Sequence, residues 1–297
     1  MTKRSIVKGH KNTGDKVYMI SVAVVLALFS AILILLAVWG IFTSFKSDFD
    51  FMYNKSGFPK EWTLSNYSLA WDKMYCLVDN GNRRVYMEEM FLNTVLYAGG
   101  CALAATFVPC MMAYLTVRFP CKFSKAVTAF VIIAMILPIV GNLPGEIQMA
   151  TALGLYDNIW GLWIMKANFL GLYFLVLQGA FKSLPPSLSE AAKLDGAGEF
   201  QIFVRVMLPL VRTTLALIFL VKFIEFWNDY QIPLIYLPNH PTISQGLYYF
   251  NFSTDNTVAT VPVKIAGAMF VLLPILIVFF AFRNKLMGNL TLGGIKE

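Results

Sequence analysis

Long runs of residues without a single charge constrain this sequence more than any other feature. The stretch between Lys16 and Lys46 is uncharged over 29 residues, and similar apolar runs recur along the chain. About 20 helical residues cross the roughly 30 Å hydrocarbon core of a bilayer. A soluble domain could not bury 58% hydrophobic residues beside only 14% charged ones, so part of the solvent of this chain must be lipid.

Six apolar segments are predicted to cross the membrane, and the chain is therefore expected to be an all-α polytopic membrane protein. The segments lie near Tyr18–Phe42, between Glu89 and Arg118, between Lys125 and Glu146, near Ile159–Phe181, near Thr213–Leu237, and between Lys264 and Arg283. The first is too long for the core of a signal peptide, and no small-residue cleavage site follows it. We interpret it as an uncleaved first span.

The distribution of Lys and Arg predicts how the spans are oriented. The tail 1–16 carries five of these residues, the loop after the second span three, the loop after the fourth span four and the C-terminal tail three. With six spans, all four segments fall on one side of the membrane, and basic residues in short loops favour the cytoplasmic side. Both termini are therefore predicted to be cytoplasmic. The net charge of +7 is read as an orientation signal and not as a surface for nucleic acid.

These assignments divide the chain into three parts. Residues 1–17 form a cytoplasmic tail, residues 18–285 the six-span transmembrane domain, and residues 286–297 a second cytoplasmic tail. Within the domain, 43–89 is an external loop and 183–209 a cytoplasmic loop. The four cysteines have no spacing typical of zinc or of a disulfide framework and are interpreted as structural, with Cys76 in the external loop as the natural thiol probe of topology.

The loop 183–209 is polar although membrane spans flank it on both sides. Pro185 and Pro186 suit the first turn of a helix, and Ser187 with Glu190 has the spacing of a capping box. The sequence predicts a short helix that ends near Leu194, where Asp-Gly-Ala-Gly is typical of a turn.

A second short helix is predicted from Glu199 to Leu208, with Pro209 opening the next span. The result is a helical elbow that stands off the cytoplasmic face. Its small residues Ala191, Ala192 and Gly196 would allow another protein to approach closely. An ordinary interfacial loop is the alternative interpretation.

The elbow resembles the cytoplasmic signature of the permeases of binding-protein-dependent ABC importers, E-A-A-x-x-D-G-A followed by a Leu-Pro end. The matching residues are Glu190, Ala191, Ala192, Asp195, Gly196, Ala197, Leu208 and Pro209. Val206 replaces the Ile of the family pattern. The resemblance implies that the first short helix is a coupling helix, which sits in a groove of the ATPase and carries nucleotide-driven motion into the membrane.

Further motifs resemble the carbohydrate-uptake branch of that family, and in particular the second permease of maltose-type importers. They are T-S-F-K-S at 43–47, L-S-N-Y at 64–67, Asn93-Thr94, A-Y-x-x-x-R-F at 113–119, L-G-L-Y-D-N at 153–158, E-F-W-N-D-Y at 225–230 with Pro233-Leu234, and the glycine-containing tail from Gly288 to Lys296. Two features depart from the pattern. The segment Cys76–Arg84 looks inserted, and the tail lacks the usual Gln-Arg pair.

The resemblance implies a permease subunit without catalytic activity in a prokaryotic cell membrane. Its expected partners are a second homologous permease, two cytoplasmic ATPase subunits, an extracytoplasmic solute-binding protein and the lipid bilayer. No cofactor is expected on this chain, and ATP with Mg²⁺ would bind the ATPases. Gly9–Lys16 supports this assignment, because it lacks the Lys and the Ser or Thr of a phosphate-binding loop. The tail residues Gly288, Gly293, Gly294 and Lys296 are expected to contact the ATPases.

Charged residues inside the fifth span are costly unless they face protein or water. Lys222, Glu225 and Asp229 fall on one face of a helix, where they would form a neutralising cluster or a polar wall of the solute path. Path residues are predicted at Gln178, Glu225, Trp227, Asn228, Asp229 and Tyr230, because rings and hydrogen-bonding groups suit sugars. The competing hypothesis is an ion-coupled secondary transporter that uses the three charged residues as its coupling site.

Overall fold

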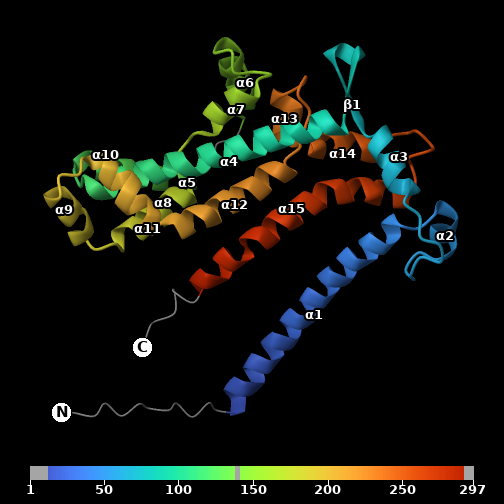
Figure 1. The fold of residues 1–297 in the computed structure, drawn as a ribbon, viewed down its shortest axis with the longest axis horizontal. Coiled ribbons are helices and arrows are strands. Elements are labelled where there is room, and N and C mark those ends of the chain that lie inside the picture. The colour runs from blue at the N-terminus through green and yellow to red at the C-terminus, as the bar shows by residue number, and fades with distance from the viewer. Residues whose placement is uncertain (1–12, 138–140, 291–297) are drawn as a thin grey trace.

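The computed structural model describes residues 13–137 and 141–290, which form a helical protein built around one central helix (Figure 1). The helices that pack into the body of the molecule are α1 (Thr13–Ser44), α4 (Met87–Arg118), α5 (Lys122–Ile136), α7 (Ile159–Lys166), α8 (Leu172–Lys182), α12 (Arg212–Asn228) and α15 (Val261–Leu290). Helix α4 packs along α12, α8 and α7, and α15 packs against α12 and α1.

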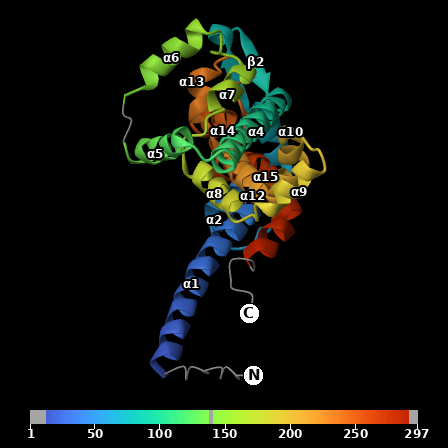
Figure 2. The same cartoon turned by 90° about the vertical axis from the view of Figure 1, so that its left-hand side faces the viewer.

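Most of the short elements gather at the two ends of the long helices. One end holds α2 (Asp48–Tyr53), α3 (Ser65–Lys73), β1 (Tyr75–Val78), η1 (Asp79–Gly81), β2 (Arg83–Tyr86) and α14 (Ile243–Asn251). The other end holds α9 (Ser187–Leu194), α10 (Glu199–Gln201), η2 (Ile202–Met207) and α11 (Leu208–Leu210). Helices α6 (Leu143–Ala152) and α13 (Gln231–Tyr236) lie above α4 between the two ends. Figure 2, viewed along the length of the molecule, shows α1 pointing away from the other helices.

Small residues let α4 take the central position. Ala98, Cys101 and Ala102 are fully buried on it, so neighbouring helices approach its backbone closely. At Gly100 the approach is closest, because a β-carbon there would overlap the ring of Trp163 from α7. The indole nitrogen of Trp163 donates a hydrogen bond to the carbonyl of Leu96 at 3.0 Å, which fixes the ring against Gly100.

Helix α1 differs from α4 in burial, because none of the residues in its most apolar part is buried. Most of its Leu, Ile and Val side chains are more than half exposed, on every face of the helix. A helix that is apolar on every face suits a lipid environment. Figure 1 shows it angled away from the other helices, and it meets α15 near Gly40, where the side chain of Met269 lies 3.5 Å from the position of a β-carbon.

Three helices in the described residues are long and apolar enough to cross a membrane, namely α1, α4 and α15. A fourth span results if the segment Glu199–Leu210 and α12, which meet at an angle of 76°, are counted together. The expectation of one continuous helix near 159–181 is wrong. Helices α7 and α8 are separated by unwound backbone that includes Gly171 at φ +145°.

The third expected span is also shorter than its apolar run, because α5 ends at Ile136 after 15 residues. Helix α15 continues to Leu290, so Gly288 is helical and the tail predicted to start at 286 begins inside a helix. Gly293, Gly294 and Lys296 lie outside the described residues.

The inserted-looking segment Cys76–Arg84 forms an antiparallel hairpin, in which Tyr75 pairs with Tyr86 and Val78 with Arg83. Asn80 and Gly81 turn the chain at positive φ, as Asn-Gly commonly does in tight hairpins. Asn239 anchors the hairpin tip, because its side-chain oxygen accepts from the backbone N–H of Asp79 at 3.0 Å.

Cys76 is a poor topological probe, contrary to expectation. Its side chain is buried in the hairpin with 2% exposure, and burial raises the pKa of its thiol to about 12. Cys121 is exposed at the start of α5, and its hydrogen bond with the Ser124 side chain lowers the pKa of its thiol. Since the thiolate is the reactive form, Cys121 is the better target.

We expect a membrane-impermeant maleimide to label Cys121 in inverted membrane vesicles but not in intact cells, because this residue follows the second span on the predicted cytoplasmic side. Mass spectrometry of the labelled chain measures the reaction, and Cys121→Ser is the control. In the Cys121→Ser background, a cysteine introduced by Thr254→Cys, at an exposed site on the opposite end of the molecule, should react in intact cells. The reverse pattern would invert the topology.

Candidate functional site

The predicted elbow is present at one end of the molecule, and its first helix, α9 (Ser187–Leu194), ends at Leu194 as predicted. The capping box is not formed. Pro186 occupies the N-cap and makes no side-chain cap hydrogen bond, while Ser187 is already the first helical residue. The hydroxyl of Ser189 instead donates to the carbonyl of Pro186 at 2.8 Å. The two prolines therefore start the helix without help from Glu190, which is exposed.

The turn after α9 is a Schellman motif centred on Gly196. The N–H of Ala197 donates to the carbonyl of Ala192 and the N–H of Gly196 to that of Lys193, both at 3.0 Å. Gly196 has φ +81°, a conformation that residues with a β-carbon adopt at a cost. Open space surrounds the position where its β-carbon would lie. Within this chain, only the backbone conformation calls for glycine there.

A charged cluster ties the elbow to the end of α4. Arg118, the last residue of α4, donates to the Glu199 carboxylate at 3.1 Å and to the Ser189 hydroxyl at 3.1 Å. Lys193 also pairs with Glu199. The hydrogen bonds from Lys193 and Arg118 lower the pKa of Glu199, so its carboxylate stays charged at neutral pH. Both arms of the elbow are thus attached to the central helix.

The outer side of the elbow carries apolar side chains that contact little of this chain. Leu194 is 89% exposed and Phe200 is 76% exposed. Ala191 and Gly196 are exposed between them, and Asp195 and Pro209 are exposed as well. Ala192, Ala197 and Leu208 instead pack partly against an apolar cluster beneath the elbow. A protruding leucine beside small residues is the shape of a surface that docks into a partner.

The second arm of the elbow differs from its prediction. It is helical from Glu199 to Leu210, and residues Ile202–Met207 are π-helical, a form that recurs at functional sites. Pro209 lies in the last turn of this arm and not at the start of the span. The chain then bends by 76° before α12 begins at Arg212.

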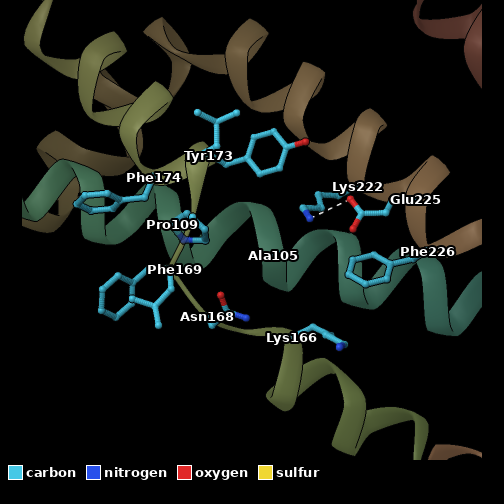
Figure 3. A pocket seen from close by; sticks show the side chains of 13 residues that line it. Ala105, Pro109, Lys166, Asn168, Phe169, Tyr173, Phe174, Lys222, Glu225 and Phe226 are labelled. Atoms are coloured by element: carbon cyan, nitrogen blue, oxygen red, sulfur yellow. Dashed lines mark hydrogen bonds and ion pairs between the residues drawn. The ribbon is translucent and has the colours of Figure 1, made fainter. Parts of the chain in front are cut away.

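A cavity of about 340 Å³ lies at the level of the long helices, between α4, α8 and α12 (Figure 3). Its lining includes Ala105 and Pro109 of α4, the unwound segment 168–171, Tyr173 and Phe174 of α8, Lys166 of α7, and Lys222, Glu225 and Phe226 of α12. Lys222 donates to Glu225 at 2.9 Å, and its ammonium lies 5.1 Å from the ring centre of Tyr173. The cavity therefore combines rings with charged groups.

Asp229 follows the last residue of α12 and belongs to no ion pair with Lys222 or Glu225, so the expected three-residue cluster is wrong and only the Lys222–Glu225 pair forms. The Asp229 carboxylate accepts from the hydroxyl of Tyr97 at 3.0 Å and from the N–H of Gln231 at 2.9 Å. It thus caps the start of α13, where the N–H groups lack helical partners.

The other predicted path residues are dispersed. Trp227 is buried and donates to the carbonyl of Val271, Asn228 is exposed, and Tyr230 stacks on Tyr248 with ring centres 4.7 Å apart. Gln178 is buried and donates to Thr116 and Thr128. Of the six predicted path residues, Glu225 alone lines the cavity.

Lys166, Asn168 and Tyr173 line the cavity but are absent from the residues that the sequence predicted for the solute path. Their signal is the polar pair Lys166–Asn168 followed by Gly171 inside an apolar run. Such residues interrupt a membrane helix where the freed backbone faces protein or water. The break brings all three residues to the cavity, although none of them lies on the helix that carries Lys222.

A bundle of apolar helices, with a cavity between α4, α8 and α12 that is lined by both rings and charged groups, has the features of a membrane transport protein. The family model described as "binding-protein-dependent transport system inner membrane component" matches residues 105–286, and the chain belongs to this family. The protein is thus a permease subunit of a binding-protein-dependent importer, embedded in the cell membrane.

Relatives extend this similarity over most of the chain. The melibiose/raffinose/stachyose import permease of Bacillus subtilis is 27% identical over 86% of this chain and 88% of its own length. A maltodextrin transport system permease of Streptococcus pneumoniae is 30% identical over 69% of this chain and 74% of its own.

A solved structure has the same fold. A chain of a bacterial ABC transporter involved in the import of the acidic polysaccharide alginate superposes with a TM-score of 0.73 at 22% identity, covering 96% of this chain and 99% of that chain.

We expect Gly196→Trp to abolish import while the chain still inserts and pairs with its partner. A β-carbon at this φ costs about 1–2 kcal/mol, and the indole would also fill the docking surface. Gly196→Asn, which tolerates positive φ, should keep most uptake. The matched control is Gly154→Trp, since Gly154 has φ +68° in similarly open space far from the elbow. For each variant, the measurements are solute uptake and the amount of ATPase that co-purifies with the permease. Wild-type uptake by Gly196→Trp would refute a coupling role.

Proposed function

We propose that this chain is one of two non-identical permeases of an ATP-driven importer that takes up a sugar or oligosaccharide. Its relatives named above import or transport saccharides, and the motifs of the carbohydrate branch run from residue 43 to the tail. The observation that carries the proposal is the exposed elbow with Leu194 at its tip. A transporter without a separate energy-supplying subunit has no use for such a surface.

The proposed topology has six spans and cytoplasmic termini. Helices α1, α4, α5, α8, α12 and α15 alternate in direction along the chain, with the α9–α11 elbow inside the cell and 43–89 outside. Helices α5 and α8 are short for a bilayer, and the partner permease and the adjoining segments complete their passage. ATP and Mg²⁺ bind two ATPase subunits, one of which receives the elbow.

The coupling residues we propose are those of the exposed elbow: Glu190, Ala191, Ala192, Asp195, Gly196, Ala197, Leu208 and Pro209. The solute path includes the cavity, with Glu225, Lys222 and Lys166 on its wall. An extracytoplasmic binding protein delivers the solute at the opposite end. Family membership favours this scheme over an ion-coupled secondary transporter, and the hydrogen bonds that hold Asp229 at the start of α13 remove one of the three groups on which that alternative depends.

The test is uptake by proteoliposomes that contain both permeases and the ATPases, with the binding protein outside and ATP inside. Raffinose, maltotriose, diacetylchitobiose and digalacturonate form the panel. We expect at least one to accumulate only with ATP and the binding protein, and to be indifferent to ionophores. Accumulation driven by an ion gradient without ATP, or transport of no saccharide, would contradict the proposal.

Within that assay, Leu194→Asp should reduce uptake by roughly tenfold or more, because it places a charge where an apolar side chain docks. Its control is Leu194→Met, which keeps volume and polarity. Since Leu194 is 89% exposed in this chain, neither change should alter folding. Equal loss in both variants would show that the elbow tip is not a docking surface.

A further inference from the structure

The charges that line the cavity do not balance. The side chains on the cavity wall that are charged at neutral pH are Lys166, Lys222 and Glu225. Lys222 and Glu225 neutralise each other at 2.9 Å. Lys166, which ends α7, belongs to none of the ion pairs found within residues 13–137 and 141–290. One positive charge is therefore left on the wall of the cavity (Figure 3).

Three carboxylates that flank this wall in sequence lie outside the cavity lining. Asp229 accepts hydrogen bonds from the Tyr97 hydroxyl and from two backbone N–H groups, of Gln231 and Ile232. Glu146 accepts from the Tyr236 hydroxyl at 3.2 Å, and Asp157 accepts from the side chain of Asn239 at 2.7 Å. Among the described residues, Glu225 is the one carboxylate on the wall, and it is paired with Lys222. The wall itself therefore carries one more positive than negative charge when solute displaces water from the cavity.

The backbone adds a positive potential in the same place. Helix α8 begins at Leu172 against the cavity, and its N-cap, Gly171, has no side chain to accept from the first-turn N–H groups. These groups carry the positive end of the helix dipole. Broken membrane helices of transporters use such ends to meet anionic groups of their substrates. The unpaired lysine remains the primary observation, and the helix end adds to it.

A neutral sugar that filled this cavity would remove water from an unpaired ammonium and supply only hydroxyl groups. Burying a charge without a counter-charge is costly. An anionic group on the solute would instead pair with Lys166 through charge-assisted hydrogen bonds, which are roughly twice as strong as neutral ones. The rings of Phe226 and Tyr173 and the amide of Asn168 would still contact the neutral part of a sugar.

We propose that the solute is an anionic saccharide, carrying a carboxylate or an ester phosphate, and that Lys166 is the residue that selects for its charge. This inference rests on the proposed function and narrows its substrate class. The Lys222–Glu225 pair forms the neutral part of the same wall, with Lys222 held between Glu225 and the ring of Tyr173.

The test measures saccharide binding to the complete permease–ATPase complex in nanodiscs, without the binding protein, so that the selectivity of the latter does not intervene. The probes are digalacturonate, sucrose 6-phosphate and raffinose. We expect wild type to bind one of the anionic probes at least about tenfold more tightly than raffinose, and the preferred probe identifies the anion. Lys166→Met should remove that preference and Lys166→Arg should keep it.

The control is Lys264→Met, which removes a lysine of α15 that donates to the carbonyl of Asn251 away from the cavity. It should leave the preference unchanged. Raffinose binding as tight as that of both anions in wild type, or an unchanged preference in Lys166→Met, would overturn the inference. So would loss of the partner permease from the Lys166→Met complex, since the counter-charge would then come from the partner. If neutral saccharides are nevertheless imported with ATP, the proposed function stands and only the substrate class fails.

Discussion

Hydrocarbon offers no hydrogen-bond partner to a peptide group, and the rest of this structure depends on that constraint. It makes helices the only means of crossing the membrane and restricts unwound backbone to places that protein or water covers. The break between α7 and α8 is such a place, because residues 168–171 face a cavity walled by α4, α8 and α12. An unwound segment that would be costly against lipid thus becomes part of the cavity wall, next to Lys166.

Two helices, α4 and α12, connect the elbow to the cavity. Helix α4 ends in Arg118, which holds both arms of the elbow, and lines the cavity with Pro109 and Ala105, about two and a half and three and a half turns earlier. Helix α12 starts at the 76° bend after the elbow and carries Lys222 and Glu225 further along. Under the proposed coupling role, a displacement of the elbow would act on the cavity wall through these continuous helices, without a long chain of intermediate contacts.

How much could be predicted from the sequence depended on the range of the interactions involved. The existence of α9 and its end at Leu194 were predicted, because prolines and the Asp-Gly turn act locally, and α1 and α4 followed from uninterrupted apolar runs. The capping box failed because Pro186 already occupied the cap. The hairpin 75–86 was missed as a structure, since its strands are short and rest on contacts with distant Asn239. The cavity required packing of three helices, and spacing along α12 alone wrongly grouped Asp229 with Lys222.

Helix α1 has a consequence for the order in which the molecule is assembled. Its main long-range neighbour is α15, the last helix of the chain, so α1 leaves the ribosome well over two hundred residues before that neighbour exists. During this interval it must persist alone in lipid. Its apolar surface on every face and its self-satisfied backbone make that possible. Helix α1 is thus synthesised long before it can pack against α15. Until then it anchors the nascent chain in the membrane while the core forms between α4, α8 and α12.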